Sequence, residues 1–195
     1  MTAVTLNLRP ILSLSLSDEQ FFELCQANRD LKFERNERGE ILILSLTGGE
    51  TGKRNAELVF QLQAWSRQNK LGIVFDSSTG FKLPNGSTRS PDAAWVQRDR
   101  WDALTPQQRR KLPPLCPDFI VELLSATDDL EELQAKMREY QANNMRLGWL
   151  IIPKSRQVEV YHPNGEVEIL DNPTVVSGEP LLPGFVLDFQ TLFED

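Results

Sequence analysis

Apolar and polar residues alternate along the chain in a way that predicts short strands and a few longer helices. Short apolar runs bounded by Gly, Pro or Asn are typical of strands, and apolar residues repeated every three or four positions are typical of helices. The first pattern predicts strands over residues 31–35, 41–46, 71–75, 79–83, 90–96, 117–124, 149–152, 158–161 and 167–170. The second predicts helices that begin near residues 18, 53, 106 and 128. Together they predict an α/β fold in which a mixed central sheet is flanked by helices on both faces.

Two of the predicted strands carry acids at positions that should be buried. The run over 117–124 is nearly all apolar, which is typical of a strand covered on both faces, yet it contains Glu122. Asp92 follows Ser-Pro at the start of the strand over 90–96. An ionised carboxylate costs several kcal/mol to bury unless a cation or several donors compensate it. Both acids are therefore candidate functional residues.

The helix predicted from residue 128 should turn one lysine toward the sheet. Its apolar stripe consists of Leu130, Leu133, Met137 and Tyr140. At about 100° per residue, Lys136 lies about 70° from the centre of this stripe and Arg138 about 130° from it. We therefore expect Lys136 to lean toward the sheet and Arg138 to face water.

These residues resemble the pattern of a known family. Asp92 after Ser-Pro and Glu122 within Val-Glu-Leu are similar to the Uma-two family of restriction-endonuclease-like proteins, which belongs to the PD-(D/E)XK nuclease superfamily. Lys136, followed by Tyr140, extends the resemblance, and the segment 148–153 matches the family's next strand. The similarity covers about residues 31–170.

The resemblance implies a restriction-endonuclease-like core and metal-dependent hydrolysis of phosphodiester bonds in DNA. Asp92 and Glu122 would bind one or two divalent ions, with the backbone carbonyl of Leu123 or Leu124 completing the coordination. The superfamily's lysine normally stands two residues after the acid, where this chain has Leu124. Lys136 on the following helix is the candidate to orient or activate the attacking water and to stabilise charge on the scissile phosphate.

Two further acids have alternative interpretations. The resemblance places an acid near the first strand of the predicted hairpin, and Glu34 is the matching position; the alternative is an exposed strand acid. Glu57 lies near the apolar face of the helix predicted from residue 53, where it either approaches a metal or stays on the surface.

The residue inventory narrows the chemistry. A Ser-His-Asp triad would have to use His162, the only histidine, at a predicted turn, and no Gly-x-Ser-x-Gly motif exists. A zinc site would need more Cys or His than are present, since Cys25 and Cys116 lack metal spacing. Oxygen ligands remain, and these suit Mg²⁺ or Mn²⁺.

The net charge of −7 argues against a protein that coats nucleic acid without specificity. It does not exclude a nuclease, because a bound divalent cation reverses the local field at an acidic site. A modest basic cluster is either a solvated face or a phosphate-contacting patch; it consists of Arg98, Arg100, Arg109, Arg110 and Lys111.

The length of 195 residues suits one domain, 1–195. Residues 1–16 are expected to form an extended N-terminal arm, and 171–195, rich in Pro and Gly, to close over the core. No apolar run approaches the ~20 residues of a membrane span, and the N-terminus lacks a signal-peptide pattern. With two cysteines interpreted as reduced thiols, we expect a cytoplasmic protein with no membrane partner.

A second hypothesis keeps the fold without catalysis. In it, Asp92 and Glu122 form an internal salt bridge with Lys136 or an arginine, and the protein is a binding or regulatory module. A homodimer fits either hypothesis, since a symmetric dimer would suit double-strand cleavage.

Overall fold

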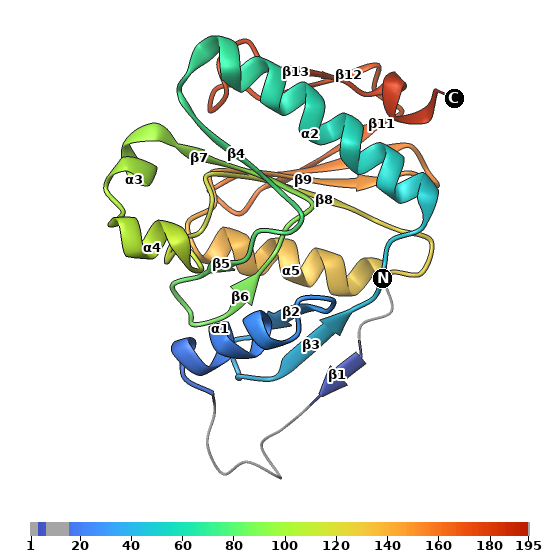
Figure 1. The fold of residues 1–195 in the computed structure, drawn as a ribbon. Helices are drawn as coiled ribbons and strands as arrows, with labels where there is room; N and C mark the ends of the chain where they lie inside the picture. The colour runs from blue at the N-terminus through green and yellow to red at the C-terminus, as the bar shows by residue number, and fades with distance from the viewer. Residues whose placement is uncertain (1–3, 7–15, 195) are drawn as a thin grey trace.

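The computed structural model describes residues 4–6 and 16–194. Its centre is a six-stranded mixed sheet between two long helices, α2 (Gly49–Asn69) on one face and α5 (Leu130–Ala142) on the other (Figure 1). The strand order is β11-β10-β9-β8-β7-β4. In chain order these strands are β4 (Gly72–Asp76), β7 (Ala93–Gln97), β8 (Phe119–Leu123), β9 (Leu147–Ile152), β10 (Gln157–Tyr161) and β11 (Val167–Asp171). The predicted α/β fold with a mixed sheet flanked by helices is confirmed.

A second sheet lies on the α5 side of the first (Figure 1). The sequence predicted the central sheet but not this second one. Its strand order is β1-β3-β2-β6-β5, with β1 (Val4–Leu6), β2 (Lys32–Arg35), β3 (Ile41–Leu44), β5 (Phe81–Lys82) and β6 (Thr88–Arg89). Phe81 and Leu83 pack against Met137 and Tyr140 of α5, so this helix is covered on both sides. The predicted arm 1–16 falls mostly outside the described residues; β1 pairs antiparallel with β3.

Successive side chains of β8 point to opposite faces of the sheet and so belong to two different apolar clusters. Phe119, Val121 and Leu123 point into the apolar cluster under α2, whereas Ile120 belongs to the cluster under α5. Since neighbouring strand residues face opposite sides of a sheet, Glu122 points toward α5 with Ile120. Both sides of the strand are buried, as the nearly continuous apolar run predicted.

Glycine on β9 lets α5 approach the sheet closely. A Cβ added at Gly148 would lie 2.6 Å from the terminal methyl of Met137 on α5 and 2.5 Å from that of Met145. A larger residue would require these flexible methionine ends to move aside. Glycine therefore leaves room for the two methionines to pack directly on β9.

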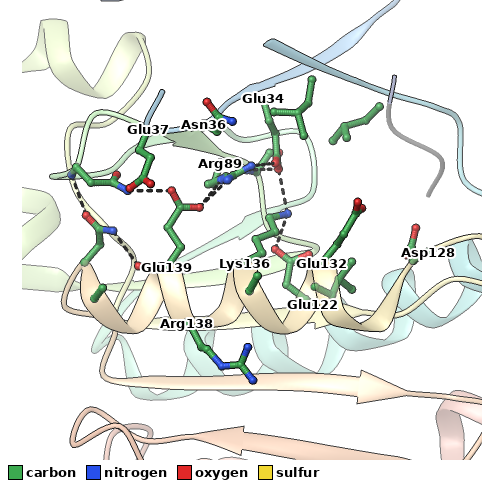
Figure 2. A pocket seen from close by; sticks show the side chains of 18 of the residues that line it. Glu34, Asn36, Glu37, Arg89, Glu122, Asp128, Glu132, Lys136, Arg138 and Glu139 are labelled. Carbon is green, nitrogen blue, oxygen red and sulfur yellow. Dashed lines mark hydrogen bonds and ion pairs between the residues drawn. The ribbon is translucent and has the colours of Figure 1, made fainter. Parts of the chain in front are cut away.

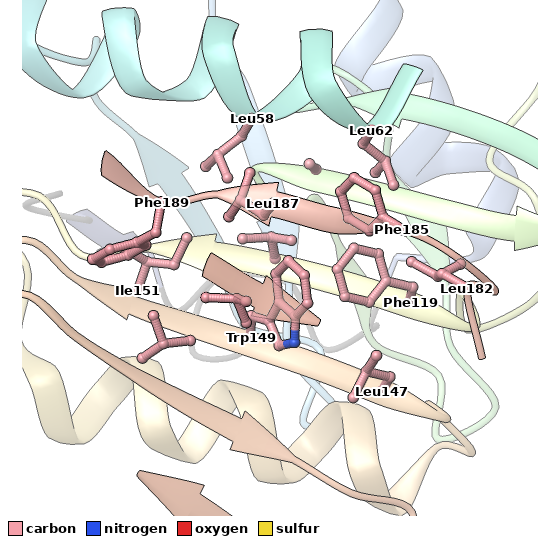
Figure 3. Close-up of a cluster of buried hydrophobic side chains, with 14 of the residues drawn as sticks. Leu58, Leu62, Phe119, Leu147, Trp149, Ile151, Leu182, Phe185, Leu187 and Phe189 are labelled. Carbon is pink, nitrogen blue, oxygen red and sulfur yellow. The ribbon is translucent and has the colours of Figure 1, made fainter. Parts of the chain in front are cut away.

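The C-terminal segment packs on the α2 side of the sheet (Figure 3). It forms a hairpin, β12 (Val175–Ser177) and β13 (Val186–Asp188), and a short 3-10 helix, η1 (Gln190–Phe193). Phe185 and Leu187 are buried in one cluster with Leu58 and Leu62 of α2 and with Trp149 of β9.

Helix boundaries follow their capping residues. A capping box at Ser17 opens α1 (Asp18–Ala27), and a second box opens α4 (Pro106–Arg110). The helix predicted to begin near residue 53 begins earlier, because α2 starts at Gly49 with Gly48 as its N-cap, a position where glycine is well tolerated. The one-turn helix α3 (Arg98–Asp102) was not predicted.

Candidate functional site

Strands β7 and β8 bring the two predicted acids together. They pair antiparallel with Ala93 opposite Val121. One residue further along this register, Asp92 lies beside Glu122 on the face toward α5. The backbone N–H of Leu123 donates a hydrogen bond of 2.9 Å to Oδ2 of Asp92. Only 5% of Asp92 and 4% of Glu122 are exposed, so two carboxylates lie side by side in the interior.

Helix α5 supplies the cation of this site. Lys136 Nζ lies 2.8 Å from Oε1 of Glu122 and 3.0 Å from Oε1 of Glu34. Figure 2 shows Lys136 between these two acids and Arg138 on the other side of the helix. Arg138 is exposed. Lys136 therefore lies on the side of the helix that faces the site and Arg138 on the exposed side, as helical spacing predicted.

Glu34 reaches the site from β2 of the second sheet. It is 2% exposed and accepts a hydrogen bond of 2.9 Å from the backbone N–H of Ser90. The guanidinium of Arg89 donates to its other carboxylate oxygen at 3.1 Å and forms a second ion pair with Glu139 at 2.7 Å. The interpretation of Glu34 as an exposed strand acid is wrong, since the residue is buried among three donors.

Several residues that position the acids were not singled out from the sequence. Asn55 of α2 donates from Nδ2 to Oδ1 of Asp92 at 3.0 Å. The Tyr140 hydroxyl donates to Oε1 of Glu122 at 3.0 Å, a contact that neither the apolar stripe nor the family resemblance had indicated. Glu57 does not join them, because it accepts a hydrogen bond from Gln61 and is not part of the cavity lining.

The two glutamates share Lys136, but their pKa values move in opposite directions. Burial raises the pKa of Glu122 to about 7, and the negative charges of Asp92 and Glu34 add to this effect. Burial acts on Glu34 as well, but the positive charges of Lys136 and Arg89 outweigh it and lower the pKa of Glu34 to about 2. Glu122 is therefore the less well compensated acid of the site.

A cavity of about 700 Å³ opens onto these residues. Asp92, Glu122, Glu34 and Lys136 all contribute to its lining, as does Leu123. The Leu123 side chain lies in the apolar cluster on the opposite face of the sheet, so only its backbone belongs to the site.

The oxygen donors of the cavity fit a hard divalent cation. In the described part of the chain, no group of three or more Asp, Glu, His or Cys side chains is arranged to hold a metal ion. Asp92 and Glu122 nevertheless form a buried pair of carboxylates, and Mg²⁺ commonly binds through one or two carboxylates, with waters and substrate phosphates as its other ligands. Each carboxylate oxygen has two acceptor sites, so those of Asp92 retain capacity beyond their two hydrogen bonds. The site therefore fits Mg²⁺ or Mn²⁺ shared with a substrate.

Other candidate residues lie apart from this cavity. His162 follows β10 at a turn, with Nε2 3.7 Å from a carboxylate oxygen of Glu168. Cys25 and Cys116 are both free thiols. Within the basic cluster, Arg109 pairs with Asp102 and Lys111 with Glu19, so these charges are partly neutralised on the surface.

Comparison with protein families identifies the relatives of this chain. Residues 18–190 match the family model Uma2, described as "Putative restriction endonuclease". The chain belongs to the Uma2 family. No curated protein matches it.

The fold is shared with a solved structure. This is a "putative nuclease belonging to DUF820" from Anabaena variabilis, with a TM-score of 0.75 and 20% sequence identity over 91% of this chain and 97% of that one. None of the helices in the described ranges is both long and apolar enough to cross a membrane.

In this Uma2 member the ammonium beside Glu122 comes from Lys136 of α5, and position 124 holds Leu.

Proposed function

We propose that this Uma2 protein is a metal-dependent endonuclease that hydrolyses phosphodiester bonds in DNA. The observation that carries the proposal is the buried pair of Asp92 and Glu122 on adjacent strands, open to a cavity and beside a lysine ammonium. A nuclease family and a nuclease fold agree with it. A buried carboxylate pair with this lysine is difficult to explain by stability alone, because such charges cost more than apolar residues of similar size.

The carboxylates of Asp92 and Glu122 are the proposed ligands of Mg²⁺ or Mn²⁺, together with the backbone carbonyl of Leu123. Glu34 adjoins this set through Lys136 and is proposed as a further ligand. When bound, the metal polarises the phosphoryl oxygen and lowers the pKa of its water. Asn55 and the Leu123 N–H hold the Asp92 carboxylate in place from two sides.

Lys136 is proposed to orient the attacking water. Its ammonium carries three protons and contacts Oε1 of both Glu34 and Glu122, so one donor remains for the water or for the attacked phosphate. Burial and the charge of Arg89 oppose protonation of Lys136, but the charges of the two glutamates prevail and raise its pKa. The side chain therefore acts as a fixed cation and donor rather than as a base.

The decisive experiment is cleavage of supercoiled plasmid by purified protein in Mg²⁺, Mn²⁺ or EDTA. Asp92→Asn is the sharpest variant, because it keeps an acceptor oxygen for the Leu123 N–H while removing the charge. We expect nicking that requires metal and falls at least a hundredfold in the variant, since loss of a ligand removes several kcal/mol of transition-state stabilisation. Equal cleavage by both proteins, or none by the wild type, contradicts the proposal.

Lys136→Ala should also remove cleavage while leaving Mn²⁺ binding largely intact, because lysine is not a metal ligand. Arg138→Ala is the matched control: it lies two residues away on the same helix, on the exposed side (Figure 2), and should cut like the wild type. Wild-type activity in both variants would rule out a role for Lys136.

One observation favours the second candidate function, a binding or regulatory module without catalysis. The charges of the site already compensate each other, with Lys136 between two acids and Arg89 between Glu34 and Glu139. Such a network is also what a structural ion-pair cluster would contain. A protein that binds DNA yet never cuts it in Mn²⁺ would support this alternative.

A further inference from the structure

A second cavity of about 730 Å³ meets the first at Ser90 and Asp92. Residues from α1, β2 and β3 line it, with the loop after β4. Asp92 thus stands at the boundary of two open spaces, and a chain-like substrate that crosses this boundary would pass directly over the proposed metal ligands.

The two cavities differ in charge. The first has seven acidic and four basic side chains in its lining, whereas the second has two of each. A phosphate backbone is repelled by excess carboxylates. On charge alone, the second cavity is the better place for the nucleic-acid strand beside the cleavage point.

The two basic side chains of this second lining are the exposed Arg29 and the partly buried Lys32. Lys32 lies on β2 two residues before Glu34, so both side chains project from the same face of the strand. Its Nζ makes one long hydrogen bond, 3.4 Å, to the carbonyl oxygen of Ser90, and no ion pair within residues 16–194 includes it. Lys136, by contrast, is held between two carboxylates at 2.8 and 3.0 Å.

This difference separates the tasks of the two lysines. Lys136 is neutralised by its glutamates, so its ammonium attracts a phosphate only weakly. Lys32 is partly buried, and no carboxylate of the described residues lies within ion-pair distance of its Nζ, so an anion placed against it would relieve the cost of that burial. Hydroxyl groups of Ser45 and Thr47 in the same lining can add neutral donors to a phosphate.

We infer that Lys32 binds a backbone phosphate of the DNA strand, and that the strand reaches Asp92 through the second cavity. This rests on the proposed function, in which DNA is the substrate. Lys32 is then the phosphate-contacting lysine of the site, and Lys136 organises the carboxylates and the water.

The test is binding of a fluorescent DNA duplex, measured by anisotropy in EDTA over a series of salt concentrations. The variants are Lys32→Met, which keeps the length of the side chain without its charge, Lys32→Arg, which keeps the charge, and Lys154→Met, an exposed control in the turn after β9. We expect Lys32→Met to bind at least tenfold more weakly, as loss of one charge-assisted contact predicts. Its slope of log affinity against log salt should be shallower by about 0.9, the value of one phosphate contact. Lys32→Arg should recover binding, and Lys154→Met should match the wild type.

Lys32→Met removes a charge that has no ion-pair partner and should therefore fold. If the melting temperature of Lys32→Met shows that it does not fold, Lys32→Gln replaces it as the neutral variant. Unchanged affinity and slope in the neutral variants overturn the inference while leaving the cleavage proposal intact. Absence of DNA binding by the wild type at low salt overturns both. If the wild type binds DNA through Lys32 but never cuts it, the inference stands and the nuclease proposal fails.

Discussion

The two faces of the six-stranded sheet carry opposite chemistry although the same strands build both. The face toward α2 is sealed by aromatic and aliphatic side chains, with Trp149 stacked on Phe185 and edge-on to Phe119 (Figure 3). The face toward α5 has an apolar part but also holds Asp92 and Glu122 next to an open cavity (Figure 2). The contrast indicates that the α2 face stabilises the fold, and that the α5 face gives up stability to hold charges.

The unfavourable free energy of burying charges on the α5 face can be compared with the favourable free energy of burying apolar side chains on the α2 face. A buried aromatic side chain contributes a few kcal/mol of transfer free energy, whereas a buried carboxylate costs several kcal/mol before its partners compensate it. Lys136 and Tyr140 compensate Glu122 only in part, since its pKa is raised to about 7. Substitutions on the two faces should therefore differ in sign as well as in size.

The largest effect on stability is expected on the α2 face. Trp149→Ala should lower the free energy of unfolding by about 3–5 kcal/mol, because it empties the centre of a closely packed cluster. Ile169→Ala on the edge strand β11, where the side chain is 63% exposed, is the control and should change it by about 0.5 kcal/mol or less. Urea denaturation measures both. A loss below about 1 kcal/mol for Trp149→Ala would contradict the claim that the apolar face is the main source of stability.

The sequence predicted the contrast between the faces only where local pattern decides it. Glu122 was conspicuous because it interrupts an apolar run, and strand alternation then assigns it to one face. Lys136 followed from helical periodicity. The strands over 31–35, 41–46 and 79–83 were predicted, but their grouping into a second sheet was not. Strand β6 joins β2 to β5 in that sheet, and its two residues are too few to show any period.

Contacts between distant segments were the other limit. Glu34 was placed at the site by family resemblance alone, and Asn55, Arg89 and Lys32 were not singled out at all. Asn55 donates to Asp92 across 37 residues of sequence, and Arg89 donates to Glu34 across 55. Lys32 contacts the carbonyl oxygen of Ser90 across 58 residues. No local pattern in the sequence encodes such packing.

Glu34, which approaches the charged face from β2 of the second sheet, should behave as a stabilising residue. Its pKa is lowered to about 2, so the ionised form contributes stability above the ordinary value of 4.5, and this contribution is lost as the pH falls through 2. Glu34→Gln should cost about 2–3 kcal/mol at pH 7 and progressively less below pH 4.5. Denaturation midpoints at pH 7 and pH 3 test this. An equal cost at both pH values would show that charge is not what Glu34 contributes.

Glu122 should show the opposite sign and the smallest effect. Because its pKa is raised to about 7, the folded protein holds the proton more tightly, and stability falls as the pH rises from about 4.5 to 7. Glu122→Gln in EDTA should therefore equal the wild type near pH 5 and exceed it by about 1 kcal/mol at pH 8, after allowance for the lost contact with Lys136. Chemical denaturation at both pH values measures the difference. A loss of several kcal/mol at pH 8 would make Glu122 half of a structural ion pair.

The most direct test of the central claim, that the charged face binds a catalytic metal, is calorimetric titration of Mn²⁺ into metal-free protein at pH 8. The wild type should bind. Its free energy of unfolding should rise by about 2.7 kcal/mol when free Mn²⁺ is at a hundredfold excess over the dissociation constant, and its melting temperature should rise accordingly. Asp92→Asn should weaken binding at least tenfold, whereas Glu139→Gln, an acid of the same cavity that pairs with Arg89, should not. Heats that are absent in the wild type, or unchanged in Asp92→Asn, would contradict the account.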